Sequence, residues 1–353
     1  MSAIEFQCVA KHYGSVRAVD DLSLAVEAGE LVTVLGPSGS GKSTILGLIA
    51  GLTHPTAGAI RIGGRDVTAL PAAARNVGLV FQSYALFPNM TVRRNIAFPL
   101  WVRRVKAADI ASRVDAALRL VHMEALASRR PHQLSGGQQQ RVAIARAVVF
   151  EPDILLLDEP LAALDRKLRE EVRGELHRLQ RSLGITTLLV THDQEEALSL
   201  SDRVVVLEHG RVRQSGHPQE LYLRPVNRFV ADFLGVGNFF DGVNEITASG
   251  PVLRTEDGLV ISHCDRAAVP GTRATALLRP ENIALAADGT GIPLVVRDAV
   301  YLGQHVRYTV TTPSGRELLV AVAGRHAVYP PGTALLGTWT ADDVWLIPET
   351  PTL

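Results

Sequence analysis

A glycine-rich run at residues 36–44 contains residue types that suit phosphate binding. It follows the apolar run Leu31–Leu35 and precedes a stretch rich in leucine and isoleucine, which predicts a strand, a loop and a helix in that order. Glycines let backbone N–H groups turn toward phosphate oxygens, and the start of the helix adds a positive field. A glycine-rich surface turn has a similar composition, but the flanking elements favour a phosphate cradle. The candidate nucleotide-binding residues in this run are Gly36, Pro37, Ser38, Gly39, Ser40, Gly41, Lys42, Ser43 and Thr44.

Two carboxylates, Asp158 and Glu159, directly follow the apolar run Ile154–Leu157. Ligands bind at the carboxyl ends of strands in open α/β sheets, so we expect Asp158 beside the phosphate cradle. Lys42 is then expected to reach the β- and γ-phosphates, Ser43 to ligate Mg²⁺, and Asp158 to hold the same ion through water. Glu159 is placed to polarise an attacking water. Two acids at a plain helix N-terminus are the alternative interpretation, which the cradle disfavours.

Residues 1–235 alternate short apolar runs with helical patterns, which is typical of an α/β fold with a mostly parallel sheet. Between Asp165 and Leu183 an apolar stripe at helical spacing predicts one long helix. Residues 93–150 are helical in pattern without a clear strand, so we expect a helical subdomain of about residues 83–150 inserted in the sheet domain. The predicted buried strands are 31–35, 154–157, 187–190 and 204–207.

The chain changes character near residue 235. Short alternating runs and many Gly, Pro and Thr residues follow, and residues 256–258 and 313–315 have the composition of hairpin turns. We therefore expect a second domain, residues 236–353, with a small all-β, barrel-like fold. Two similar β units are an open alternative for this tail.

The segment Leu134–Gln138, which contains Ser135, Gly136 and Gly137, lies between the phosphate cradle and the carboxylate pair. In that place it resembles the signature of the ABC transporter ATPases, which are P-loop NTPases. The resemblance covers residues 1–235 and implies that Ser135, Gly136, Gly137 and Gln138 contact the ATP held by a partner subunit.

Other segments fit the same family in order. Tyr13 resembles the aromatic residue that stacks on adenine, Gln82 the residue that senses Mg²⁺ and the membrane partner, and His192 the switch residue that contacts the γ-phosphate. The resemblance therefore implies catalytic roles for Lys42, Gln82, Glu159 and His192 and Mg²⁺ contacts for Ser43, Gln82 and Asp158. Residues 163–165 resemble the loop that crosses between two subunits. Ala162 and Asn89 depart from the importer pattern, where Ser or Gly and His are frequent.

The tail extends the resemblance. Residues 278–283 and 301–303 resemble motifs of the OB-like regulatory domain, of TOBE type, found in maltose, polyamine, sulfate and ferric-iron importer ATPases. Residues 229–235 with Asn238 and Phe239 are nearest to the polyamine members. The family implies a head-to-tail homodimer, two transmembrane permease subunits, and a periplasmic or lipid-anchored solute-binding protein. It implies a peripheral position on the cytoplasmic face of a bacterial inner membrane.

Composition limits the alternatives. The 36 Lys+Arg balance 36 Asp+Glu, and residues 236–353 carry 8 basic and 12 acidic residues, a net charge of −4, so nucleic acid is not an expected partner. Residues 83–150 carry 11 basic and 3 acidic residues, a net charge of +8, which fits either a solvated helical face or a surface near lipid or an acidic partner.

Further alternatives are judged on what the sequence lacks. Cys8 and Cys264 form no disulfide framework, and we see neither a signal peptide nor an apolar run of the roughly 20 residues that span a bilayer. We therefore expect an intracellular protein that attaches to a membrane through a partner. A soluble, non-transport ABC ATPase remains the main alternative. A nucleic-acid-binding tail and an exporter ATPase are less favoured.

Overall fold

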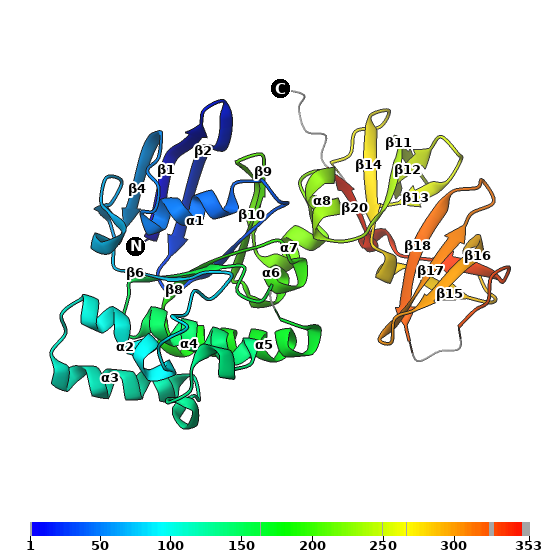
Figure 1. Cartoon of the computed structure of the whole chain (residues 1–353). Coiled ribbons are helices and arrows are strands. Elements are labelled where there is room, and N and C mark those ends of the chain that lie inside the picture. The colour runs from blue at the N-terminus through cyan, green and yellow to red at the C-terminus, as the bar shows by residue number, and fades with distance from the viewer. Residues whose placement is uncertain (1, 163, 249, 266, 325–327, 348–353) are drawn as a thin grey trace. The chain divides into compact units, whose positions relative to one another are not determined.

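The computed structural model describes residues 2–162, 164–248, 250–265, 267–324 and 328–347. The chain divides into two compact units, residues 1–218 and 219–353 (Figure 1). Each unit has its own hydrophobic core.

A six-stranded, mostly parallel sheet is the framework of the first unit. Neighbouring strands from β9 to β6 are parallel, and only the edge strand β10 pairs antiparallel. The four predicted strands are confirmed because their apolar runs are buried on both faces, as a covered parallel sheet requires. The order is β10 (Arg211–Gly216), β9 (Arg203–Glu208), β3 (Leu31–Leu35), β8 (Thr186–Thr191), β7 (Ile154–Asp158) and β6 (Val77–Val80).

A second, antiparallel sheet in this unit was not predicted. Its strand β2 alternates buried and exposed residues from Leu22 to Glu27, which is the period of a half-buried strand. That signal was present in the sequence, but the longer apolar runs concealed it. The order is β2 (Val16–Glu27), β1 (Ser2–Tyr13), β4 (Ala57–Ile62) and β5 (Arg65–Asp66). One core cluster joins this sheet to α1 and to one face of the six-stranded sheet.

Helices complete the first unit. The predicted helical subdomain is present, with its own core of apolar residues from α2, α3 and α4. The predicted helix after Asp165 is α5, and Asp165 caps it by accepting a hydrogen bond from the Leu168 N–H. The helices are α1 (Lys42–Ala50), α2 (Val92–Val102), α3 (Ala107–Leu120), α4 (Gly136–Val148), α5 (Arg166–Leu183) and α6 (Gln194–Leu200), with 3₁₀ turns Ala72–Ala74, Glu124–Leu126 and Pro131–Gln133.

The second unit contains two five-stranded antiparallel sheets that share one core, so the tail is all-β as predicted. Both predicted hairpins are present, between β12 and β13 and between β17 and β18. One sheet has the order β13 (Val260–Ser262), β12 (Gly250–Thr255), β11 (Asn238–Thr247), β14 (Arg273–Leu278) and β20 (Val344–Ile347). The other has β15 (Ala284–Ala286), β19 (Ala334–Thr338), β16 (Ile292–Tyr301), β17 (His305–Thr311) and β18 (Glu317–Ala323). The 3₁₀ turns are Pro280–Asn282 and Ala341–Asp343.

Two short helices, α7 (Pro218–Leu223) and α8 (Arg228–Leu234), precede these sheets. The buried Arg279 guanidinium donates to the carbonyls of Tyr222, Ala231, Gly235 and Val236. These bonds tie both helices to the second unit. The compact units therefore divide at residue 218, whereas the sequence-based boundary follows the change in composition at residue 235.

Within the described part of the chain, every helix is too short or too polar to span a bilayer.

Candidate nucleotide site

The loop between β3 and α1 is the predicted phosphate cradle. Gly41 has φ 105°, and a Cβ atom there would lie 2.2 Å from the Ala18 carbonyl oxygen, so only glycine fits. A Cβ atom on Gly36 would lie 2.5 Å from the Leu207 carbonyl oxygen. The Lys42 amine donates to the carbonyls of Gly36 (2.8 Å) and Pro37 (2.9 Å). The lysine thus crosses the loop, and its neighbours Ser38, Gly39 and Ser43 are exposed while Ser40 is buried.

The electrostatics of this loop favour binding of both an anion and a cation. Burial lowers the pKa of Lys42, and the charges of Glu159 and Asp158 oppose that shift. Burial also raises the pKa of Asp158, an effect that Glu159 reinforces and Lys42 opposes. A buried ammonium gains from nearby phosphate, and two close carboxylates gain from a cation. The two predicted carboxylates therefore act electrostatically on the predicted lysine.

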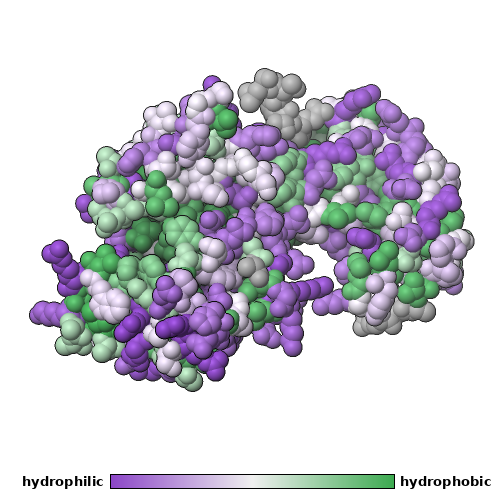
Figure 2. Space-filling model, in the orientation of Figure 1, coloured by the Kyte–Doolittle hydropathy of each residue, from purple (hydrophilic) through white to green (hydrophobic). Residues whose placement is uncertain are grey.

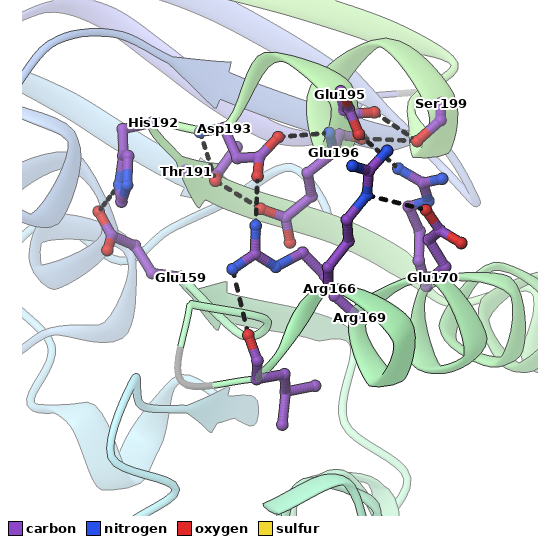
Figure 3. Close-up of polar contacts among 12 residues, drawn as sticks. Glu159, Arg166, Arg169, Glu170, Thr191, His192, Asp193, Glu195, Glu196 and Ser199 are labelled. Carbon is purple, nitrogen blue, oxygen red and sulfur yellow. Dashed lines mark hydrogen bonds and ion pairs between the residues drawn. The ribbon is translucent and has the colours of Figure 1, made fainter. Parts of the chain in front are cut away.

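Glu159 brings two other predicted residues together. One of its carboxylate oxygens lies 3.0 Å from Nδ1 of His192 (Figure 3). The other accepts a hydrogen bond from the Gln82 amide at 3.2 Å. Glu159 itself has φ 43°, and its N–H donates to the Val190 carbonyl, so the turn after β7 points this carboxylate across to the end of β8. Residues from three separate strand ends thus meet at one carboxylate.

The loop that carries His192 is held from the opposite side by a set of polar contacts (Figure 3). Asp193 accepts from Arg169 at 3.1 Å, and the other terminal nitrogen of Arg169 donates to the Leu164 carbonyl at 3.2 Å. Asp193 also caps α6 by accepting from the Glu196 N–H. Arg169 therefore links the start of α5 to the His192 loop, a connection that the sequence analysis missed.

Ser135 caps α4 in a capping box, in which its side chain and that of Gln138 bond each other's backbone N–H. Gly136 packs closely on Leu164, and Gly137 on Leu168 of α5, since a Cβ atom on either glycine would lie 3.0 Å from the leucine side chain. No contact joins Ser135 to Lys42, Glu159 or His192 within the residues that the structure describes. The signature segment is therefore held by its own capping box and is not hydrogen-bonded to the cradle residues.

Tyr13 ends β1, and 51% of its surface is exposed, with the Lys11 amine 4.8 Å from the ring centre. The next strand, β2, brings Ala18 against Gly41, so the hairpin that carries Tyr13 adjoins the cradle. Thr44 is half-buried on α1. In the predicted crossing loop, Ala163 lies outside the described residues, while Leu164 is buried and Asp165 caps α5.

The donor set fits Mg²⁺ bound together with phosphates. Among the described residues, no group of three or more His, Cys, Asp or Glu side chains forms a metal cage. Instead, the exposed Ser43 hydroxyl and Gln82 and the half-buried Asp158 are oxygen donors around the cradle. Mg²⁺ is commonly held by one or two carboxylates plus substrate phosphates. Burial and the charge of Glu159 raise the pKa of Asp158, so a cation beside this carboxylate would favour its ionised form.

Comparison with known proteins identifies the family of the chain. Residues 19–162 match the family model described as ABC transporter, and residues 276–347 match the TOBE domain. An Fe(3+) ions import ATP-binding protein, FbpC, of Rhizobium etli is 45% identical over 340 residues, which cover 95% of each chain. The chain belongs to the ABC transporter ATP-binding proteins.

Other relatives of this ABC ATPase include a spermidine/putrescine import ATP-binding protein, PotA, of Photobacterium profundum. It is 46% identical over 325 residues, covering 90% of this chain and 87% of that protein. A solved dimeric ATP-binding cassette bound to ADP and Pi aligns with a TM-score of 0.55 and 34% identity, over 61% of this chain and 98% of that one. Members of this family bind and hydrolyse ATP to drive transport, and the expected fold and enzyme class are confirmed.

Proposed function

We propose that this ABC ATPase energises import of a small solute, and that its hydrolytic centre is the group of side chains around Glu159. The observation that carries the proposal is the meeting of Gln82, Glu159 and His192 at one carboxylate, beside Lys42 and Asp158. In this arrangement Gln82 and His192 orient the Glu159 carboxylate. A general base must be oriented in this way to accept a proton from the attacking water.

Each residue then has a defined role. When ATP binds, the Lys42 amine exchanges its hydrogen bonds to the carbonyls of Gly36 and Pro37 for bonds to the β- and γ-phosphates. The charged phosphate oxygens are stronger acceptors than the two neutral carbonyls. Glu159 accepts a proton from the attacking water, and His192 holds the γ-phosphate side of the site. Gln82 orients the water and the ion. Tyr13 stacks on the adenine ring.

Ser43, Gln82 and Asp158 are the residues that would hold Mg²⁺, which neutralises charge on the β- and γ-phosphate oxygens when bound. The chain's own contribution is to direct these oxygen donors to one side of the cradle.

We infer further that two copies act head to tail, with Ser135, Gly136, Gly137 and Gln138 of one copy completing the site of the other. Two observations support this. Among the residues that the structure describes, Ser135 is hydrogen-bonded to none of the hydrolytic side chains, and a related cassette bound to ADP and Pi is dimeric. The first turn of α4 carries no acidic residue, so the backbone N–H groups at its N-terminus suit an anion.

The proposed membrane partners are two permease subunits, fed by a periplasmic or lipid-anchored solute-binding protein. Exposed apolar side chains of the first unit include Leu52, Phe81, Trp101 and Val102. Figure 2 shows apolar side chains gathered on this unit where the helical subdomain adjoins the sheets. Such a patch suits a protein partner better than water. The chain would then lie on the cytoplasmic face of the inner membrane.

The relatives' names include both Fe(3+) and spermidine/putrescine importers. We favour a polyamine, on the sequence of residues 229–239, with ferric iron as the alternative. Both are multivalent cations. A soluble, non-transport ATPase is disfavoured, because the relatives align over 95% and 90% of this chain, including its β tail.

The test is reconstitution. The chain is co-purified with its permease subunits and binding protein, placed in liposomes, and supplied with radiolabelled spermidine or ⁵⁵Fe(3+). ATP-dependent uptake of one solute supports the proposal, and Glu159→Gln complexes should show none. ATPase activity without uptake of any solute, in complexes shown to be intact, contradicts it.

A further inference from the structure

The segment after Gln82 contains two consecutive non-glycine residues in the left-handed region. Tyr84 has φ 60° and Ala85 has φ 46°. L-residues adopt this conformation rarely and at a cost, so something must hold the turn. The Tyr84 N–H donates to the Phe81 carbonyl at 2.8 Å, which closes the turn that carries Gln82.

The side chain that holds this turn is Arg146, near the end of α4. Its two terminal nitrogens donate to the carbonyls of Ala85 (2.7 Å) and Tyr84 (2.8 Å). Its guanidinium lies 5.7 Å from the centre of the Phe87 ring. A planar, charged fork with two donors fits two successive carbonyls in a way that a single ammonium does not.

A second clamp holds the other end of the segment. The fully buried Asn95 side chain accepts from the Phe87 N–H and donates to the Phe87, Met90 and Thr91 carbonyls. The segment from Phe81 to Thr91 is thus fixed at both ends, while Gln82 itself is exposed and free to follow a ligand. The position of Gln82 depends on the turn that Arg146 holds.

We propose that Arg146 is a positioning residue for ATP hydrolysis: by holding the left-handed turn at Tyr84 and Ala85, it sets Gln82 against Glu159. Because Arg146 and Ser135 lie on the same helix, α4, it also connects the signature segment rigidly to the Gln82 segment. This inference rests on the role proposed above for Gln82.

The experiment compares Arg146→Met, Arg146→Lys and the double variant Arg146→Met/Ala85→Gly in the full chain. For each, kcat, the KM for ATP and the Mg²⁺ concentration for half-maximal activity are measured, together with the melting temperature. Arg146→Met should lower kcat about tenfold and raise the Mg²⁺ requirement, with the KM for ATP within about twofold of wild type. Arg146→Lys should recover part of kcat, because it retains the charge.

Glycine at residue 85 provides the sharper measurement. Ala85 is exposed, so Ala85→Gly removes little packing, and glycine adopts positive φ without strain. The double variant should therefore recover kcat and the Mg²⁺ requirement without Arg146. A residue that only stabilises the fold would change the melting temperature and would not be rescued in this way.

Two further variants distinguish an error in the role of Gln82 from an error in the role of Arg146. Arg141→Met removes another arginine of α4, one that pairs with Glu175 on α5, and should leave kcat and the Mg²⁺ requirement unchanged. Gln82→Ala should reproduce the defect of Arg146→Met. If Gln82→Ala has wild-type kinetics, the proposed role of Gln82 is wrong. If Gln82→Ala is defective but folded Arg146→Met is normal, or if the glycine gives no rescue, the inference about Arg146 is overturned.

Discussion

Glu159 and His192 lie at the ends of adjacent strands, and the carboxylate of the first is 3.0 Å from Nδ1 of the second. The contact depends on the left-handed conformation of Glu159, which turns its side chain away from β7 and toward the end of β8. The carboxylate is thereby presented to the cradle with one oxygen on His192 and the other on Gln82.

Glu159→Gln should bind ATP normally and hydrolyse it about 10²–10⁴ times more slowly, because an amide cannot accept the proton of the attacking water. Phosphate release and nucleotide titration measure the two properties. Glu170→Gln, which changes an exposed carboxylate on α5, is the control and should keep the wild-type rate. Rapid hydrolysis by Glu159→Gln would show that another residue activates the water.

Tyr13→Ala should weaken ATP binding, since stacking on a base is worth about 1–3 kcal/mol. Stacking accepts any purine, so GTP should compete appreciably in the wild type. Tyr13→Phe retains the ring and should retain the affinity. Equal nucleotide affinity in the alanine and phenylalanine variants would remove this ring from the site.

Glu196 should make the first unit less stable as the pH rises. Burial raises the pKa of this carboxyl to about 7, and Asp193 and Glu159 reinforce the shift while Thr191 and Arg169 oppose it. The folded state keeps the proton to a higher pH than the unfolded state. The loss of folding free energy caused by Glu196 is therefore absent below the unfolded pKa of 4.5. It grows from there to about pH 7 and is then constant.

Glu196→Gln removes the titrating group while it keeps the size of the side chain. At pH 8 the variant should exceed the wild type in free energy of unfolding by roughly 1–3 kcal/mol, and at pH 4.5 the gap should close. Urea unfolding at both pH values measures this. Glu195→Gln, on the exposed neighbour, should show no such difference. A gap that is the same at both pH values contradicts the assignment.

A chain cut after residue 218 should fold and bind ATP, because every proposed nucleotide-binding residue and a separate core lie before that point. A chain cut after residue 235 should be less soluble, since it keeps α8 but loses its covering partners Leu277 and Ile347. Sedimentation and nucleotide titration compare the two fragments. If only the longer fragment is soluble, the division lies nearer residue 235. Dimerisation without ATP should weaken in both.

Much of the fold and site could be predicted because the signals are local. Buried parallel strands appear as continuous apolar runs, and the cradle needs glycine where the backbone has positive φ or touches another chain segment, as at Gly41. Asp158 was expected beside the cradle because the ends of parallel strands meet at one edge of the sheet, whereas the contact of Glu159 with His192 is seen only in the structure.

The parts that could not be predicted depend on contacts between distant segments. Arg169 and Arg146 resemble the other arginines of their helices, and only the fold shows that each donates to a loop carbonyl. The antiparallel sheet was missed because its alternation is weaker than the apolar runs around it. Residue 235 marks the change in composition, whereas Arg279, far along the chain, fixes where α7 and α8 pack.

In the proposed dimer, two chains build each hydrolytic site. Ser135→Arg should block hydrolysis while it leaves ATP binding to the monomer intact. Lys42→Ala should weaken phosphate binding in the cradle of the chain that carries it. In a heterodimer of these variants, one site carries both changes and the other carries neither. The most direct measurement is therefore the ATPase rate of the mixed variants. The mixture should show activity that neither variant shows alone, and the specific activity of the wild type should rise with protein concentration. No activity in heterodimers shown to form, with a wild-type specific activity independent of concentration, would contradict the two-chain site.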